Sequence, residues 1–232
     1  MKYTNIVQGK FISRPNRFIA KVMIDGWEHT VHVKNTGRCR ELLLPGATVF
    51  MEKSSNPQRK TQYDLVAVIK KYKDGREPVL INMDSMAPNI AAYEWIANKA
   101  RKADCKVRKE VTYGDSRLDI CVEEANGSKT FIEVKGVTLE QDGVAMFPDA
   151  PTQRGVKHIY ELIKCVQDGN KAYILFVIQM KGCHTFSPNK SMHPEFAAAL
   201  CRAQQNGVGV IAMDCAITPD SMIIDSLIPV QL

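Results

Sequence analysis

An acidic pair and a lysine on two neighbouring strand candidates form the clearest chemical pattern in the sequence. Asp119 lies within Arg117-Leu118-Asp119-Ile120, and Glu133 and Lys135 lie within Ile132-Glu133-Val134-Lys135. Because successive side chains of a strand point to opposite faces, we expect the apolar residues to share one face and the charged residues the other. Thirteen residues that include a turn dipeptide separate Asp119 from Glu133, so a hairpin would place the two carboxylates side by side.

Two carboxylates beside a lysine indicate a consistent chemistry. Carboxylate oxygens suit Mg²⁺ and Mn²⁺, and such an ion activates a bound water and neutralises charge on a phosphoryl transition state. Lys135 would orient the attacking water or balance charge on the phosphate. We therefore predict Asp119, Glu133 and Lys135 as catalytic residues, with Asp119 and Glu133 as ligands of Mg²⁺ or Mn²⁺. A salt bridge between Glu133 and Lys135 on a solvated sheet face is the alternative that the triplet alone leaves open.

Helix candidates on both sides of these strands carry further polar groups. Helical spacing from Pro88 to about residue 102 makes Glu94 an additional candidate metal ligand. A second helix, capped by Thr152 and reaching about residue 167, has an apolar stripe and an opposite polar stripe. We expect the polar stripe to hold phosphate oxygens, although an ordinary solvent face has the same pattern. The residues predicted to contact phosphate in this part of the chain are Arg117, Arg154, Lys157 and His158.

Positive charge is concentrated in the first third of the chain. Residues 1–80 hold 15 Lys and Arg against 7 Asp and Glu, whereas the remaining residues hold 16 against 18. Such an imbalance is expected of a part that faces a polyanion, and a basic surface kept for solubility would give the same count. Trp27 is predicted to be a core residue rather than a base-stacking surface. The residues predicted to contact DNA here are Arg14, Arg17, Lys34, Arg38 and Arg40.

Two patterns of expected elements divide the chain into domains 1–83 and 84–232. Strand candidates at 18–24, 27–33, 47–51, 61–72 and 78–83, with a helical segment at 35–44, favour a small OB-like β-barrel, because short strands without crossover connections close in this way. The second domain alternates helices with strands and predicts an α/β fold with a mixed central sheet. Its helix candidates are 88–102, 152–167 and 194–206, and its strand candidates are 106–112, 116–123, 130–138, 173–179 and 208–213.

The composition argues against membrane and secreted proteins. No run of 18 apolar residues exists, and the first residues lack the apolar segment of a secretory signal. The seven cysteines form no Cys-x-x-Cys pair, so we expect structural thiols in a reducing compartment rather than a zinc site or a disulfide framework. We therefore expect a cytoplasmic protein with no membrane partner.

The segment that follows the acidic pair resembles a known family. It contains Phe131-Ile132-Glu133-Val134-Lys135-Gly136-Val137-Thr138-Leu139, then Phe147-Pro148-Asp149-Ala150-Pro151-Thr152-Gln153-Arg154-Gly155 and Lys157-His158. With Asp119, Asn35-Thr36-Gly37, Phe186-Ser187-Pro188 and Leu227-Ile228-Pro229-Val230, it is similar to the sugar fermentation stimulation protein A family over almost the whole chain. Within it, Asp119 and Glu133-x-Lys135 match the PD-(D/E)xK nuclease motif, with Arg117-Leu118 standing where that motif has its proline.

The resemblance implies an OB-like first domain, a restriction-endonuclease-like second domain, and DNA as the partner. Two functions stay open. One is a nuclease that depends on Mg²⁺ or Mn²⁺; the other is a non-cleaving DNA-binding regulator of sugar catabolism genes, those for maltose included. The sequence also leaves RNA open as a substrate, and it leaves the oligomeric state open, a homodimer included.

Overall fold

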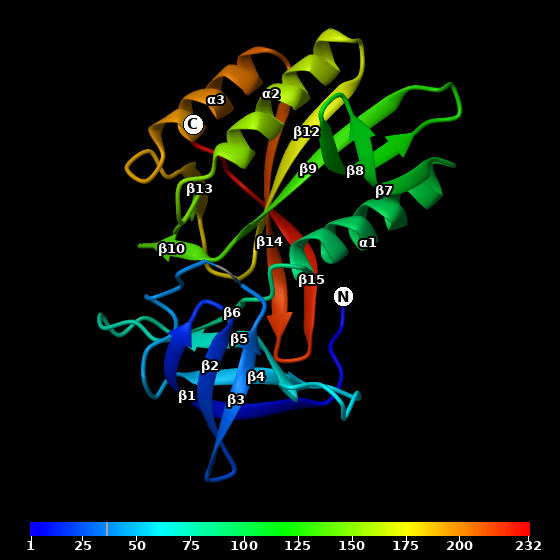
Figure 1. Ribbon diagram of the computed structural model, residues 1–232. Coiled ribbons are helices and arrows are strands. Elements are labelled where there is room, and N and C mark those ends of the chain that lie inside the picture. The colour runs from blue at the N-terminus through cyan, green and yellow to red at the C-terminus, as the bar shows by residue number, and fades with distance from the viewer. Residues whose placement is uncertain (36) are drawn as a thin grey trace.

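The computed structural model describes residues 1–35 and 37–232, and the side chains of all of these except Lys102. Figure 1 shows a barrel of strands below and a second, larger sheet with helices on both faces above it. In the described part of the chain, no helix is both long and apolar enough to cross a membrane. All seven cysteines are free.

The barrel is a closed ring of five strands, as predicted. The strand order is β3-β2-β1-β4-β5, and a parallel pairing of β3 with β5 closes the ring. A sixth strand, β6, adds to β5 in antiparallel fashion. The bounds are β1 (Ile6–Asn16), β2 (Ile19–Ile24), β3 (Trp27–Val33), β4 (Thr48–Lys53), β5 (Tyr63–Lys70) and β6 (Val79–Asn82).

Three features of the barrel differ from the sequence prediction. The long strand β1 was not predicted, because its exposed residues and Pro15 hide the alternation. The predicted helical segment at 35–44 is wrong: residues 37–44 form a bend and a turn joined by irregular backbone, in which Cys39 has a φ of 44°, outside the range of a right-handed helix. The prediction of a core Trp27 is also wrong, since 76% of its surface is exposed. Trp27 follows the Asp25-Gly26 turn at the tip of the β2–β3 hairpin, which projects beyond the barrel (Figure 1).

The second sheet is mixed and has the order β15-β14-β12-β9-β8-β7. Its three central strands β9, β12 and β14 run parallel, and the outer pairings are antiparallel. A small third sheet has the order β10-β11-β13. The bounds are α1 (Ala87–Lys102), β7 (Lys106–Tyr113), β8 (Ser116–Glu123), β9 (Lys129–Val137), β10 (Leu139–Gln141), β11 (Val144–Phe147), α2 (Gln153–Gln167), β12 (Lys171–Ile178), β13 (Thr185–Pro188), α3 (Pro194–Gln205), β14 (Gly209–Thr218) and β15 (Ser221–Ile228).

The helices cover the two faces of this sheet unequally. Buried residues of α1, such as Ala91, pack with Ile132 and Val134 on one face. Those of α2 and α3, such as Ile159 and Leu200, pack on the other. The helix candidates and the first four strand candidates of this domain agree with the structure to within two residues, whereas β10, β11, β13 and β15 were not predicted. The proposed division at residues 83 and 84 falls between β6 and α1, and it stays a prediction.

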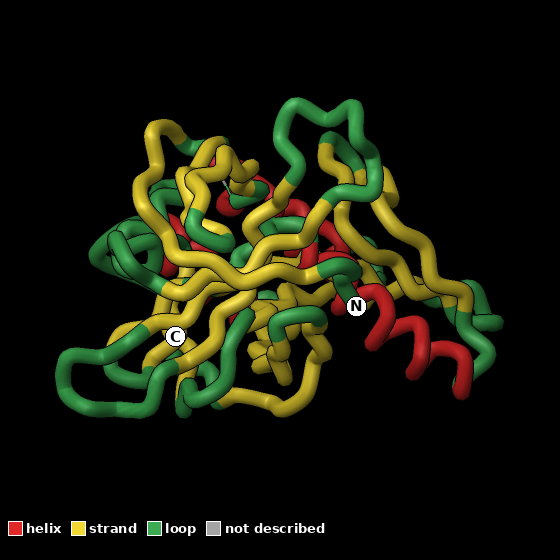
Figure 2. The backbone as a smooth tube through the Cα atoms, turned by 90° about the horizontal axis from the view of Figure 1, so that it is seen from below, coloured by secondary structure: helices red, strands yellow, loops and turns green. Residues whose placement is uncertain are grey.

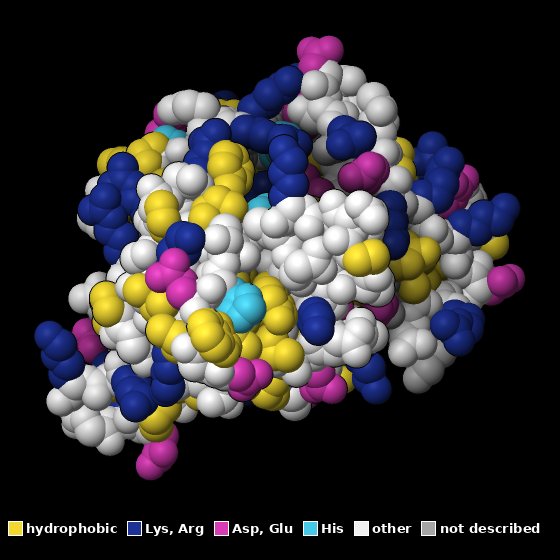
Figure 3. Space-filling model, turned by 60° about the horizontal axis from the view of Figure 1, so that its bottom comes forward, with side chains coloured by type: hydrophobic (Ala, Val, Ile, Leu, Met, Phe, Trp, Pro, Cys, Tyr) yellow, Lys and Arg dark blue, Asp and Glu magenta, His cyan; other side chains and the backbone are white. Residues whose placement is uncertain are grey.

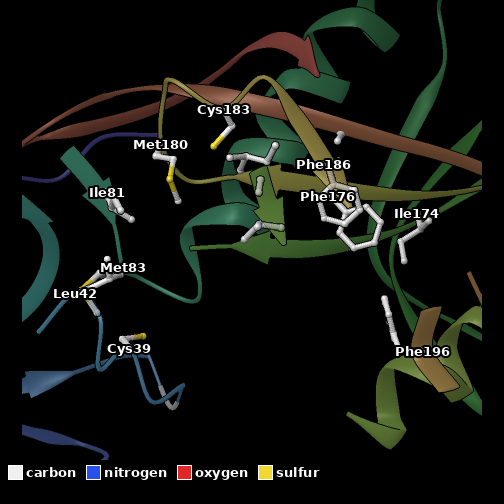
Figure 4. Packing of buried hydrophobic residues seen from close by; sticks show 14 of the residues in the cluster. Cys39, Leu42, Ile81, Met83, Ile174, Phe176, Met180, Cys183, Phe186 and Phe196 are labelled. Atoms are coloured by element: carbon white, nitrogen blue, oxygen red, sulfur yellow. The ribbon is translucent and has the colours of Figure 1, made fainter. Parts of the chain in front are cut away.

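One continuous cluster of buried side chains joins the barrel to the second domain. Leu42 and Met83 on the barrel side belong to the same cluster as Met180, Phe176 and Phe186. Figure 4 shows this path, in which the Phe176 and Phe186 rings stack with centroids 4.1 Å apart. Because a packed core transmits position from one element to the next, the barrel is held in a fixed place beside the second domain.

A buried carboxylate on β10 reinforces this attachment. Glu140 pairs with Lys70 at the end of β5 and accepts hydrogen bonds from the Tyr72 hydroxyl at 2.8 Å and the Gly143 amide at 2.6 Å. Burial alone would raise the pKa of Glu140, but the bonds from Lys70 and Gly143 outweigh it and hold the pKa below its usual value. The carboxylate is therefore ionised and ties the barrel to the second domain.

Glu140→Ala is expected to destabilise the protein by about 3–5 kcal/mol, because it leaves the Lys70 ammonium in a largely buried place without its partner. Denaturant unfolding at neutral pH measures the change. Glu77→Ala, at an exposed position nearby, is the matched control and should stay within about 0.5 kcal/mol of wild type. A Glu140→Ala protein as stable as this control would contradict the structural role assigned to the pair.

Candidate active site

Glu133 lies on β9 and faces α2, where only 2% of it is exposed. Its Oε1 accepts hydrogen bonds from the Lys135 ammonium at 2.6 Å and from Nδ1 of His158 on α2. Its Oε2 is buried and has no hydrogen-bond partner among the described residues. Leaving such an oxygen unpaired is costly, and a cation bound there would remove the cost.

Asp119 lies at the point where β8 parts from β9. The pairing of the two strands reaches Ile120 opposite Ile132, and beyond it the Asp119 Oδ2 accepts a hydrogen bond from the Val134 amide at 2.8 Å. A side chain thus replaces a backbone carbonyl in the ladder. This places the Asp119 carboxylate against the backbone between Glu133 and Lys135.

The parting of the strands also corrects one prediction. Leu118 and Ile120 were expected to share a face of β8, but they belong to different clusters. Leu118 packs with the α2 side of the sheet and Ile120 with the α1 side. The regular alternation is lost at Asp119, where the pairing with β9 ends and the facing residue of β7, Glu110, has a φ of 52°.

The two carboxylates have opposite pKa shifts. Burial raises the pKa of Asp119, and the negative charge of Glu133 raises it further. Burial would also raise the pKa of Glu133, but the hydrogen bond from His158 and the charge of Lys135 overcome it and lower the pKa. Two acidic groups whose environments separate their pKa values are typical of functional sites.

Asn89 also contacts the acidic pair, and the sequence did not predict it. Its Nδ2 donates a hydrogen bond to the Asp119 Oδ1 at 2.9 Å from the first turn of α1. The bond orients the carboxylate. The only signal in the sequence was a polar residue directly after Pro88 at the start of a helix, which is too common to single out.

Glu94 does not join this group. Its carboxylate pairs with the amino terminus of Met1 at 2.7 Å and lines a cavity of about 640 Å³ between α1, β15 and the N-terminus. Figure 2 shows the N-terminus beside this helix. Within residues 1–35 and 37–232, no set of three or more His, Cys, Asp and Glu side chains is arranged to hold a metal. The structure thus turns Asn89 rather than Glu94 towards Asp119, and the role of Glu94 as a ligand stays a prediction.

Of the polar residues predicted on α2, only His158 contacts the acidic pair; Arg154 and Lys157 are exposed. His158 is buried against Glu133, and the Arg154 Nε lies 3.4 Å from the other ring nitrogen of His158. Lys157 is exposed and donates to the Asp115 carbonyl at 2.9 Å. Arg117, on β8, is exposed and lies 3.5 Å from Glu110. The Thr152 cap accepts a hydrogen bond from the Gly155 amide, as predicted, and fixes where α2 begins.

The cations predicted on the barrel fall into two groups. The Arg14 guanidinium donates to four backbone carbonyls, those of Arg17, Asn35, Gly37 and Arg38, at 2.7 to 2.8 Å. Lys34 pairs with Asp84 at 3.1 Å and with Asp64 at 3.7 Å. These contacts hold both cations within the fold, and their predicted contacts with DNA stay a prediction. The exposed cations are Arg17, Arg38 and Arg40.

The loop that carries two of these cations reaches the second domain. Thr36, part of the Asn35-Thr36-Gly37 motif, lies outside the described residues, but a Cβ on Gly37 would lie 2.5 Å from the Asp149 Oδ2. Asp149 stands just before α2, so the loop that carries Arg38 and Arg40 contacts the segment that leads into that helix. Figure 3 shows Lys and Arg side chains gathered around a hollow in the upper part of the face that it draws.

Comparison with known proteins identifies the family. A family model described as "Sugar fermentation stimulation protein RE domain" matches residues 86–221, and one described as "SfsA N-terminal OB domain" matches residues 12–81. The chain belongs to the sugar fermentation stimulation protein family. This confirms the predicted fold, an OB barrel followed by a restriction-endonuclease-like α/β domain.

Relatives within the sugar fermentation stimulation protein family match the chain from end to end. A homologue from Desulfitobacterium hafniense strain Y51 is 51% identical over 232 residues, which cover 100% of this chain and 99% of that one. A homologue from Clostridium beijerinckii is also 51% identical and covers 100% of both chains. A solved structure, "The structure of Pyrococcus Furiosus SfsA in complex with Ca2+", is 28% identical with a TM-score of 0.85 and covers 100% of this chain and 98% of that one.

Proposed function

We propose that this protein cleaves phosphodiester bonds of DNA in a reaction that requires Mg²⁺ or Mn²⁺. The observation that carries the proposal is an acidic pair, with Glu133 buried and Asp119 partly buried, in which one buried oxygen is left unpaired. Asp119 and Glu133 lie beside each other, and the Glu133 Oε2 has no partner in the described part of the chain. A surface that only binds DNA has no use for buried acidic oxygens, since they repel phosphate and are costly to desolvate.

Each residue of the site has a defined part in this reaction. Asp119 and Glu133 would hold the cation, which when bound supplies an activated water and neutralises charge on the phosphate. Lys135, fixed by its 2.6 Å contact with Glu133, would balance charge on the phosphate oxygens. His158 would keep Glu133 in place by its own hydrogen bond to the same Oε1, which leaves Oε2 free for the cation. Two carboxylates are enough for such a site, because Mg²⁺ commonly completes its coordination with waters and substrate oxygens.

DNA is the proposed substrate because exposed cations flank the acidic pair on both domains. Arg154 and Lys157 lie on α2, and Arg38 and Arg40 lie on the barrel loop that reaches Asp149. A polyanion that spans both domains would pass the carboxylates. The family member from Pyrococcus furiosus has a structure described as in complex with Ca²⁺, which supports cation binding, since Ca²⁺ also takes oxygen ligands.

Mn²⁺ is expected to stabilise the free protein. At about 100 times its dissociation constant, a bound ion adds about 2.7 kcal/mol to the free energy of unfolding. For a chain of this size, that raises the Tm by roughly 5–10 °C. Thermal unfolding in EDTA and in Mn²⁺ measures the shift.

Asp119→Asn is expected to abolish this shift in Tm. Asp115→Asn, on the exposed turn between β7 and β8, should keep it. In EDTA at neutral pH, Asp119→Asn should instead raise the Tm. The pKa of Asp119 is higher in the folded than in the unfolded protein, so its protonated form stabilises the fold. This contribution to the free energy of unfolding is present at low pH and is lost as the pH rises through the folded pKa, whereas Asn stays neutral. The metal site would be contradicted if Mn²⁺ left the Tm of wild type unchanged, or if it raised the Tm of Asp119→Asn as much as that of wild type.

A further inference from the structure

A polar cavity between the two domains begins one residue beyond Lys135. It has a volume of about 130 Å³ and is lined by the end of β9, by the strands and loop from Leu139 to Asp149, and by barrel-side residues. A single planar heterocycle fits such a space and a base pair does not. Its lining includes Gly136, Met146, Phe147, Asp149 and Gln179.

Gln179 directs a hydrogen-bond acceptor into this cavity. Its side chain is buried, and its Nε2 donates to the Asn82 carbonyl, the Asn82 Oδ1 and the Asp84 carbonyl at 3.0 to 3.2 Å. These three acceptors fix which way the amide points. No donor among the described residues reaches the Oε1, which lies where a Cβ on Gly136 would be 2.6 Å away. The glycine leaves this acceptor open to the cavity.

The cavity therefore presents the Gln179 acceptor beside other polar groups, those of Asn35, Ser85 and Thr138, and beside apolar surface. Asp149 adds a carboxylate, whereas Phe147 and Met146 add apolar surface. A ligand that matches this lining is flat and carries several N–H groups on one edge. The Watson–Crick edge of guanine has a ring N–H beside an amino group, while thymine has a single ring N–H between two carbonyls.

We propose that this cavity receives one unstacked nucleobase of the bound DNA strand, with guanine as the preferred base. The proposal rests on the proposed function, because the base belongs to the strand that passes Lys135. Gly136 lines the cavity and directly follows Lys135, so the cavity lies one residue along β9 from the lysine that would meet the phosphate. Enzymes that seat a base in this way read its Watson–Crick edge by hydrogen bonds and tolerate a single-stranded or unpaired nucleotide best.

The test measures binding of the full-length protein to labelled single strands in EDTA, where no cleavage occurs. The strands are oligothymidylates of equal length, with no substitution or with one central guanine, adenine, cytosine or hypoxanthine. Fluorescence anisotropy is expected to show binding about 10-fold tighter with the guanine, the discrimination that one good pair of base contacts provides. Hypoxanthine lacks only the amino group of guanine, so most of the gain should be lost with it.

Asp149→Asn is expected to remove the preference for guanine while it leaves the affinity for oligothymidylate within about 3-fold. Asp142→Asn, at the exposed turn between β10 and β11, should retain the preference. Equal affinity for all five strands, or a guanine preference that survives in Asp149→Asn, would overturn the base pocket. Those results would leave the proposed nuclease standing, whereas no affinity for any strand would count against DNA as the substrate itself.

Discussion

Replacing Glu133 with Gln is expected to lower metal-dependent DNA cleavage by more than about 10³-fold, a loss beyond that of a single transition-state hydrogen bond. Gln has the shape of Glu, and its Oε1 can still accept the bonds from Lys135 and His158. The change replaces the unpaired Oε2 with an amide nitrogen, which cannot bind a cation. The effect therefore falls on the metal and leaves the surrounding packing in place.

Initial rates on labelled DNA in Mn²⁺ measure this effect. Glu123→Gln, on the neighbouring strand β8, replaces a carboxylate that is paired with Arg108 at the surface, and it should cleave at the wild-type rate. The unfolding midpoint in EDTA shows whether the Glu133→Gln fold is intact. A folded Glu133→Gln protein that cleaves within about 3-fold of wild type would rule out Glu133 as a metal ligand.

Lys135→Met is expected to lower the single-turnover cleavage rate at saturating DNA by about 10²–10³-fold, as for other groups that stabilise developing charge. The substitution keeps the apolar stem of the side chain and removes the ammonium that lies 2.6 Å from the Glu133 Oε1. Because Lys135 would act on the reacting phosphate, the dissociation constant for DNA should change little.

Lys157→Met provides the matched comparison on α2. Lys157 is exposed and points its ammonium at the Asp115 carbonyl, so it would meet DNA only at the backbone. Its loss should weaken DNA binding and lower the slope of log affinity against log salt concentration by about one, the amount for one phosphate contact. The cleavage rate at saturating DNA should stay near that of wild type. The assignment of roles would be contradicted if Lys135→Met altered only binding, or if Lys157→Met altered only the rate.

Local patterns in the sequence predicted correctly those side-chain directions that are set by a single strand or helix. The alternation along β9 placed Glu133 and Lys135 on the face opposite Ile132 and Val134, and the structure has this arrangement. The Thr152 cap and the apolar stripe predicted where α2 begins and which side it buries. In each case, the period of the element alone decides the direction of the side chain.

The sequence was insufficient where another element decides the position. Glu94 and Asn89 both lie on α1, and only the packing of that helix on the sheet settles which of them reaches Asp119. Trp27 has the composition of a core residue, but the length of its hairpin carries it past the barrel. The segment near residue 40 has a helical pattern but forms no helix, because tertiary contacts outweigh its local propensity. Arg14 hydrogen-bonds carbonyls of this loop in non-helical positions.

The most direct test of the central claim is incubation of the purified protein with labelled single- and double-stranded DNA in Mn²⁺, Mg²⁺ or EDTA, beside an Asp119→Asn protein. We expect wild type to cleave at least one of these substrates with a divalent ion, and expect no cleavage in EDTA or by Asp119→Asn. Binding that persists in EDTA without cleavage under any metal would contradict the nuclease and favour a DNA-binding regulator.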